Sequence, residues 1–136
     1  MDESTNWITP LYAGLLGLLL LYLSYSVSRE RLRYKVALGD GGQPSLQRAI
    51  RAQANLAEYA PLALVLLGGV EAQGFSPKVI HALGVLLVFG RLLHSIGLSL
   101  NAGPSAPRGI GATLTWLMIL LASGLAIFSV IFPGRF

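Results

Sequence analysis

The chain contains no cysteine. This absence excludes disulfide bonds, thiolate metal sites and a cysteine nucleophile, so any thiol chemistry must come from a bound small molecule. Charged residues are also few, because they make up 12% of the sequence against about 25% in an ordinary soluble domain. Hydrophobic residues make up 54% and the mean hydropathy is +0.64. The composition is therefore that of a membrane protein.

Four long apolar segments occupy most of the 136 residues. As helices rising about 1.5 Å per residue, they are long enough to cross about 30 Å of hydrocarbon. Stretches rich in glycine and proline separate them, and the chain is too short for a second domain. We expect one all-α domain, an integral membrane antiparallel four-helix bundle. The expected helices are residues 7–28, 45–72, 79–100 and 109–132.

Residues at or before the starts of the first two segments carry further predictions. Asp2 and Glu3, with no basic residue, precede the first segment, which is therefore expected to be a transmembrane helix and not a cleaved signal peptide. Ser45 is the expected N-cap of the second helix.

Basic residues in the loops predict the orientation. The loop at residues 29–44 begins with four of them, and Arg108 ends the loop at residues 101–108, whereas the other end of the bundle has Lys78 and Arg135. Because Lys and Arg near helix ends favour the cytoplasm, we expect both of these loops on the cytoplasmic side and both termini on the opposite side. This topology accounts for the net charge of +4. We expect no nucleic-acid partner.

The second segment carries a set of polar residues in an otherwise apolar run. A stripe within about 80° around the helix is formed by Arg48, Arg51, Asn55 and Glu58. Glu58 lies near the bilayer centre, where a lone carboxylate costs about 2.5 kcal/mol or more, so it needs a partner, either Arg51 or Arg91. The stripe either holds helices or subunits together through hydrogen bonds or forms a ligand site. Its mixture of donors and acceptors favours a small zwitterionic or anionic ligand.

Two further elements favour an anionic ligand. Arg91 and His94 are three residues apart on the third segment and share a helix face. Arg108 follows Pro107 at the start of the fourth segment, where a helix N-terminus already carries partial positive charge. The alternatives are ordinary structural roles, a membrane-interface anchor for Arg108 and a satisfied interior histidine for His94.

The stretch RAQANLAEYAPLALVLL, residues 51–67, closely resembles the signature of the membrane-associated proteins in eicosanoid and glutathione metabolism, the MAPEG family. The plan of four helices with a basic first loop covers nearly the whole chain. Within the family, HALGVLLVFGRLLHSIG is most similar to the small bacterial inner-membrane members. The matching signature positions are Arg51, Gln53, Asn55, Glu58, Tyr59 and Pro61.

The resemblance implies a homotrimer in a bacterial inner membrane that binds glutathione as co-substrate between subunits, without a metal. Gln53 would reach the neighbouring subunit's ligand, and an arginine near the end of the first helix, Arg29 or Arg31, would join the site. The catalytic residue would be Arg108. The other residues that would hold glutathione are Arg51, Asn55, Glu58, Tyr59, Arg91 and His94.

The implied activity is that of a glutathione transferase or peroxidase with a role in detoxification. Arg108 would lower the pKa of the glutathione thiol, and the thiolate would attack a lipophilic electrophile or a lipid hydroperoxide dissolved among the membrane lipids. One departure is that family synthases carry a tyrosine where this chain has Leu98. The alternatives are a non-catalytic binding or scaffold protein of the same fold and, more distantly, a small proton-coupled transporter that uses Glu58.

Overall fold

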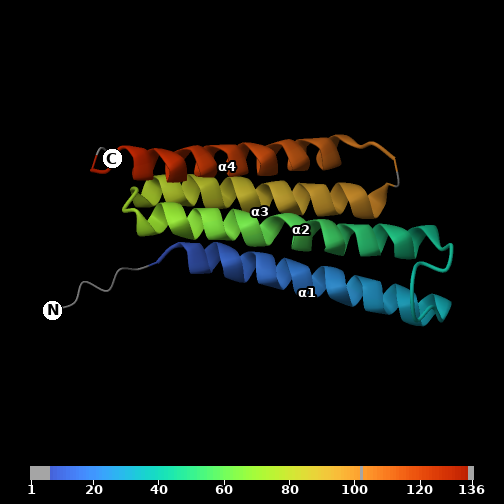
Figure 1. Ribbon diagram of the computed structural model, residues 1–136. Helices are drawn as coiled ribbons and strands as arrows, with labels where there is room; N and C mark the ends of the chain where they lie inside the picture. The colour runs from blue at the N-terminus through green and yellow to red at the C-terminus, as the bar shows by residue number, and fades with distance from the viewer. Residues whose placement is uncertain (1–6, 102, 135–136) are drawn as a thin grey trace.

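The computed structural model describes residues 7–101 and 103–134, and all regular secondary structure in these residues is helical. The helices run antiparallel in chain order, with the α1–α2 and α3–α4 loops at one end of the bundle, here called the loop end (Figure 1). The expected all-α four-helix bundle is confirmed. The helices are α1 (Thr9–Tyr34), α2 (Pro44–Ala72), α3 (Pro77–Leu100) and α4 (Ala106–Ile131).

Three residues that entered the predictions above, Asp2, Glu3 and Arg135, lie outside the described residues.

Helix α1 continues through most of the segment that was expected to be a basic loop, and it ends at Tyr34. The last turns, RERLRY, consist mainly of good helix formers. Arg33 also lies 4.0 Å from Glu30 in an i,i+3 ion pair. The loop expected at residues 29–44 therefore begins only at Lys35, and three of its four basic residues are helical.

The helices begin with proline and not with a side-chain cap. All four have a proline at the first or second helical position, and no N-cap side chain makes a capping hydrogen bond. Proline suits these positions because its missing N–H would be unpaired there in any case. Ser45 is thus not the N-cap of α2, which begins at Pro44. The Ser45 hydroxyl donates instead to Tyr34 Oη at 3.1 Å.

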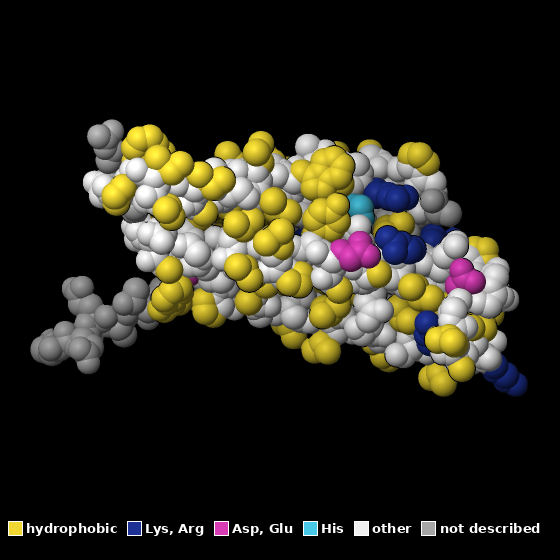
Figure 2. Space-filling view, in the orientation of Figure 1, with side chains coloured by type: hydrophobic (Ala, Val, Ile, Leu, Met, Phe, Trp, Pro, Cys, Tyr) yellow, Lys and Arg dark blue, Asp and Glu magenta, His cyan; other side chains and the backbone are white. Residues whose placement is uncertain are grey.

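Helices α1, α3 and α4 are long and apolar enough to cross a membrane by length and composition. Helix α2 is as long but carries the charged stripe, and it contacts each of the other three helices. Hydrophobic side chains are spread over much of the face in Figure 2, whereas basic and acidic side chains gather toward the loop end. The chain is therefore an integral membrane protein.

A carboxylate on α2 holds the start of α1 at the opposite end of the bundle. Glu71 accepts hydrogen bonds from the backbone N–H of Ile8 and from that of Thr9, the latter at 2.9 Å. It thus supplies the cap that α1 lacks in its own sequence. Tyr12 adds a hydrogen bond of 2.8 Å to His81 Nδ1 on α3. These contacts fix the position of α1 against α2 and α3.

Glycines let α3 and α4 pack backbone to backbone. A Cβ atom on Gly111 would collide with the backbone nitrogen of His94, and a Cβ on Gly97 would lie 2.5 Å from the backbone nitrogen of Arg108. Small residues at such positions are what allow membrane helices to approach this closely. The approach places the first turn of α4, and Arg108 with it, beside His94.

Gly111→Ala is expected to lower the free energy of unfolding by about 1–3 kcal/mol, because the added methyl group must push α3 and α4 apart. Gly109→Ala is the matched control. A Cβ at Gly109 meets nothing within 4 Å, so alanine there should be neutral or stabilise by up to about 1 kcal/mol. Thermal unfolding in detergent, followed by circular dichroism, compares the two. Equal stabilities would contradict the close α3–α4 contact.

Candidate functional site

A polar cavity of about 180 Å³ lies at the loop end between α2, α3 and α4, and we call it the site cavity. It gathers four of the residues that the family resemblance implies for the glutathione site, from three different helices. On the face in Figure 2, basic, acidic and histidine side chains lie close together in this half of the bundle. The cavity is lined by Gln47, Arg48, Arg51, Asn55, His94, Leu98 and Arg108.

Arg91 lies behind the site cavity and does not line it. Its side chain is only 1% exposed, and its guanidinium donates to Asn55 Oδ1. The same guanidinium lies 5.5 Å from the centre of the Tyr59 ring, at cation–π distance. Arg91 therefore contacts both Asn55 and Tyr59, one turn apart on α2, from within the bundle.

Glu58 pairs with Arg51 at 3.8 Å, so of its two candidate partners the structure selects Arg51. Both side chains are more than half exposed in the single chain, although they lie within a helix of membrane-spanning length. Glu58 also lines the edge of an apolar pocket of about 500 Å³ between α2 and α4, beside Tyr59 and Trp116. The polar stripe thus leads from the site cavity to an apolar pocket.

His94 and Arg108 are joined through the backbone. His94 Nδ1 lies 3.1 Å from the carbonyl oxygen of Arg108, and since a carbonyl can only accept, Nδ1 carries the proton. Arg108 is the third residue of α4, and its side chain is half-buried. The first backbone N–H groups of α4 have no side-chain cap. The guanidinium and the helix N-terminus therefore place two sources of positive potential at one point.

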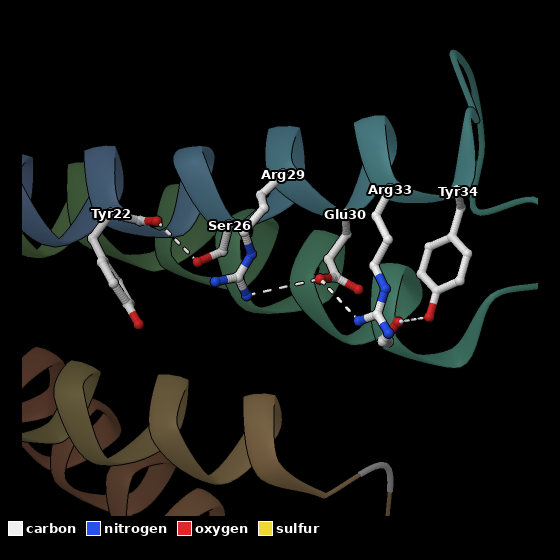
Figure 3. A network of polar contacts seen from close by, with 7 residues as sticks. Tyr22, Ser26, Arg29, Glu30, Arg33 and Tyr34 are labelled. Atoms are coloured by element: carbon white, nitrogen blue, oxygen red, sulfur yellow. Dashed lines mark hydrogen bonds and ion pairs between the residues drawn. The ribbon is translucent and has the colours of Figure 1, made fainter.

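Three residues expected in the site lie elsewhere within the single chain. Gln53 turns to α1, where its Nε2 donates to Ser24 Oγ at 2.8 Å. Arg31 donates to backbone carbonyls of the α1–α2 loop. Arg29 lines a different cavity, where its guanidinium lies 3.7 Å from Glu30 (Figure 3).

The glutathione ligands implied by the resemblance did not include Gln47 or Arg48, although both line the site cavity and Arg48 belongs to the predicted polar stripe. Gln47 is four residues before Arg51, so helical spacing could have placed it beside the stripe. Leu98, the position at which the sequence analysis noted a departure from the family pattern, lies in the wall of this cavity. Among the residues that the structure describes, no three His, Asp or Glu side chains gather so as to hold a metal ion.

Comparison with known proteins identifies the family of this chain. Residues 9–128 match the model of the MAPEG family. The inner membrane protein YecN of Escherichia coli (strain K12) is 38% identical over 118 residues, which cover 87% of this chain and 90% of that protein. Leukotriene C4 synthase of Bos taurus is 34% identical over 112 residues, 80% of this chain and 74% of the relative. Microsomal glutathione S-transferase 2 of Homo sapiens is 32% identical over 104 residues, which cover 76% of this chain and 69% of that protein. Since the family match extends from the start of α1 into the last turns of α4, this chain belongs to the MAPEG family.

Proposed function

We propose that the protein is a glutathione-dependent membrane enzyme, a transferase or a peroxidase, that binds glutathione in the site cavity. The observation that carries the proposal is the convergence of Arg51, Asn55, His94 and Arg108 on one cavity in a largely apolar bundle. A relative of the chain is named as a glutathione S-transferase, which supports the same ligand.

The charges of the site suit glutathione. At neutral pH this tripeptide carries two carboxylates and one ammonium group beside its thiol. Arg48 and Arg51 can each bind a carboxylate with charge-assisted hydrogen bonds, and Glu58 can accept from the ammonium group. Asn55, held by Arg91, adds a neutral polar contact. Arg108 is left to face the thiol.

The proposed chemistry depends on the charge at Arg108. A free thiol has a pKa of about 8.5 and is mostly protonated at neutral pH. A guanidinium beside a helix N-terminus lowers that pKa and raises the thiolate fraction. In conjugation, the thiol proton first leaves to water, and the thiolate sulfur then forms a bond to an electrophilic carbon. At an aryl halide the carbon–halogen bond breaks and halide leaves, whereas at an unsaturated carbonyl the C=C π bond breaks and the neighbouring carbon takes a proton from water. In peroxide reduction, two glutathione molecules become a disulfide while the hydroperoxide becomes an alcohol and water.

The lipophilic co-substrate would lie in the apolar pocket between α2 and α4. This pocket adjoins the polar stripe at Glu58 and Tyr59, and Trp116 and Leu62 contribute to its walls. A molecule dissolved in the bilayer could enter it from the lipid side and meet the sulfur near Tyr59.

We also propose that the protein works as a homotrimer with its loop end in the cytoplasm. The exposed pair Arg51 and Glu58 supports an oligomer, because charged groups within a membrane normally face a protein interior. Gln53 lies on the α1 side of α2, away from the chain's own site cavity, where it could face a neighbour's ligand. The number three comes from the family resemblance.

Calorimetric titration of the detergent-purified protein with glutathione tests the site. We expect saturable binding that weakens by about tenfold or more in Arg51→Ala and in Glu58→Gln, because each removes a hydrogen bond to a charged group. Lys78→Ala removes an exposed cation from the far end of the bundle and should leave binding unchanged. If the wild type does not bind glutathione and the two variants lose their oligomeric state on gel filtration, the stripe stabilises the oligomer and is not a glutathione site.

A second candidate function is a non-catalytic glutathione-binding protein. Leu98 favours it, because this side chain presents only methyl groups to the site cavity where family synthases have a tyrosine hydroxyl. Such a protein would bind glutathione in the calorimeter but would not speed its reaction with an electrophile above the uncatalysed rate.

A further inference from the structure

A second polar cavity, of about 230 Å³, lies at the loop end between α1, α2 and the last turn of α3, and we call it the α1 cavity. It shares only Arg48 with the site cavity. The proposed glutathione chemistry makes no use of its acidic group, Glu30. Its charged lining consists of Arg29, Glu30, Arg33 and Arg48.

The α1 cavity holds an unpaired acceptor and an unpaired donor. Glu30 is 7% exposed, and its Oε1 lies 3.7 Å from Arg29 and 4.0 Å from Arg33 (Figure 3). Its second carboxylate oxygen, Oε2, is buried and has no hydrogen-bond partner among the described residues, and the same holds for Nε of Arg48. Buried polar atoms are rarely left without partners. A ligand that offers both a donor and an acceptor would satisfy the two atoms together.

An apolar groove of about 450 Å³ between α1 and α3 continues from the α1 cavity along the bundle. The two share Tyr22, Leu23 and Ser99. The wall of the groove also contains Ser95, whose buried hydroxyl has no partner within the described part of the chain. The rest of its wall is formed by Leu19, Leu92, Ile96 and Leu100.

The pair of cavities therefore has the shape and polarity of a membrane lipid. Its polar end lies at the loop end, where lipid headgroups meet water, and its apolar part runs along transmembrane helices. Three guanidinium groups against one carboxylate leave a net positive charge, which a phosphate group would offset. The unpaired Glu30 oxygen adds a requirement for a hydrogen-bond donor, and a cationic donor such as an ammonium group makes the strongest hydrogen bond to a carboxylate.

We propose that the α1 cavity and its groove bind one phospholipid whose headgroup carries a phosphate and a primary ammonium group, as in phosphatidylethanolamine. The phosphate accepts hydrogen bonds from Arg33 and Arg48, and the ammonium group donates to Oε2 of Glu30. One acyl chain lies in the groove beside Ile96. A choline headgroup has the same charges but no N–H, so it cannot satisfy Glu30.

Native mass spectrometry of the delipidated protein in detergent, titrated with lipids of identical acyl chains, tests the proposal. We expect phosphatidylethanolamine to bind about tenfold or more tightly than phosphatidylcholine, the effect of one hydrogen bond to a charged group. Phosphatidylglycerol should bind less tightly than phosphatidylethanolamine. Equal affinities for the ethanolamine and choline lipids, or tightest binding of the glycerol lipid, would overturn the proposal.

Two variants localise the binding. Glu30→Gln should reduce the preference for ethanolamine over choline to about onefold, because the carboxylate is gone. Ile96→Trp fills the groove at an exposed position and should weaken all three lipids together. Lys35→Gln removes a charge at the same end of the bundle but outside the cavity and should keep the wild-type preference. An unchanged preference in Glu30→Gln, or unchanged affinities in Ile96→Trp, would place the lipid elsewhere and refute the assignment.

Discussion

Replacing Arg108 with alanine is expected to lower glutathione-dependent turnover by about 100- to 1000-fold, the usual effect of losing one preorganised electrostatic contact to a reacting group. Glutathione binding should weaken far less, because Arg48, Arg51 and Glu58 would still hold the charged ends of the peptide. In the proposed mechanism the loss falls on turnover because the guanidinium would stabilise the thiolate, and the α4 N-terminus alone would supply only part of that stabilisation.

Initial rates of conjugation to an aryl halide, measured across a pH series, check this expectation. In the wild type the rate should reach its plateau below the ordinary thiol pKa of about 8.5. In Arg108→Ala the thiol pKa returns toward that value, so the rate should keep rising to higher pH. Arg108→Lys keeps the charge without the guanidinium geometry and should fall between the two. Turnover and a pH profile equal to those of the wild type would remove Arg108 from the mechanism.

Asn55→Leu is expected to lower the free energy of unfolding by about 3–5 kcal/mol, as when one partner of a buried charged contact is removed. Arg91 is 1% exposed, and its guanidinium donates to Asn55 Oδ1. Leucine has a similar size but no acceptor, so the buried guanidinium would lose this hydrogen bond and keep its contact with the face of the Tyr59 ring. The effect should be larger than that of any substitution at an exposed position of α2.

The double variant Asn55→Leu with Arg91→Met tests whether the loss comes from the unpaired charge. It should recover much of the stability, since a matched apolar pair can replace a buried polar contact at little cost. Asn101→Leu makes the same chemical change at an exposed position and should have almost no effect. Unfolding of four variants by denaturing detergent provides the measurement: Asn55→Leu, Arg91→Met, the double variant and Asn101→Leu. Additive effects of the two single substitutions would show that Asn55 and Arg91 are not coupled.

The general architecture was predictable because it depends on local properties of the chain. Segment length and hydropathy predict membrane helices, and glycine and proline mark the breaks between them. The motif at residues 51–67 was enough to predict the family, since its polar residues recur at fixed spacing in an apolar helix. The end of α1 was predicted less well. Hydropathy drops at Arg29, but a helix needs no apolar side chains beyond the membrane, and the RERLRY turns continue it.

The composition of the site was only partly predictable. Helical periodicity placed Arg51, Asn55 and Glu58 on one face of α2 and Gln53 on another. The structure agrees with both placements. Periodicity does not reveal what covers a face. The sequence therefore left Arg91 and His94 equivalent, whereas the structure puts His94 in the cavity wall and Arg91 behind Asn55.

The sequence by itself determined that this is a membrane protein of four antiparallel helices with a polar stripe on the second, because these features follow from composition, length and helical period. Tertiary structure alone decided which residues meet. Close contact at Gly97 and Gly111 sets α4 against α3 and brings Arg108 to His94 across a loop. It also left Glu30 and Arg48, in a second cavity, each with a buried atom that has no partner among the described residues. Such pairings depend on how helix surfaces interlock, a property of several segments together that no single segment encodes.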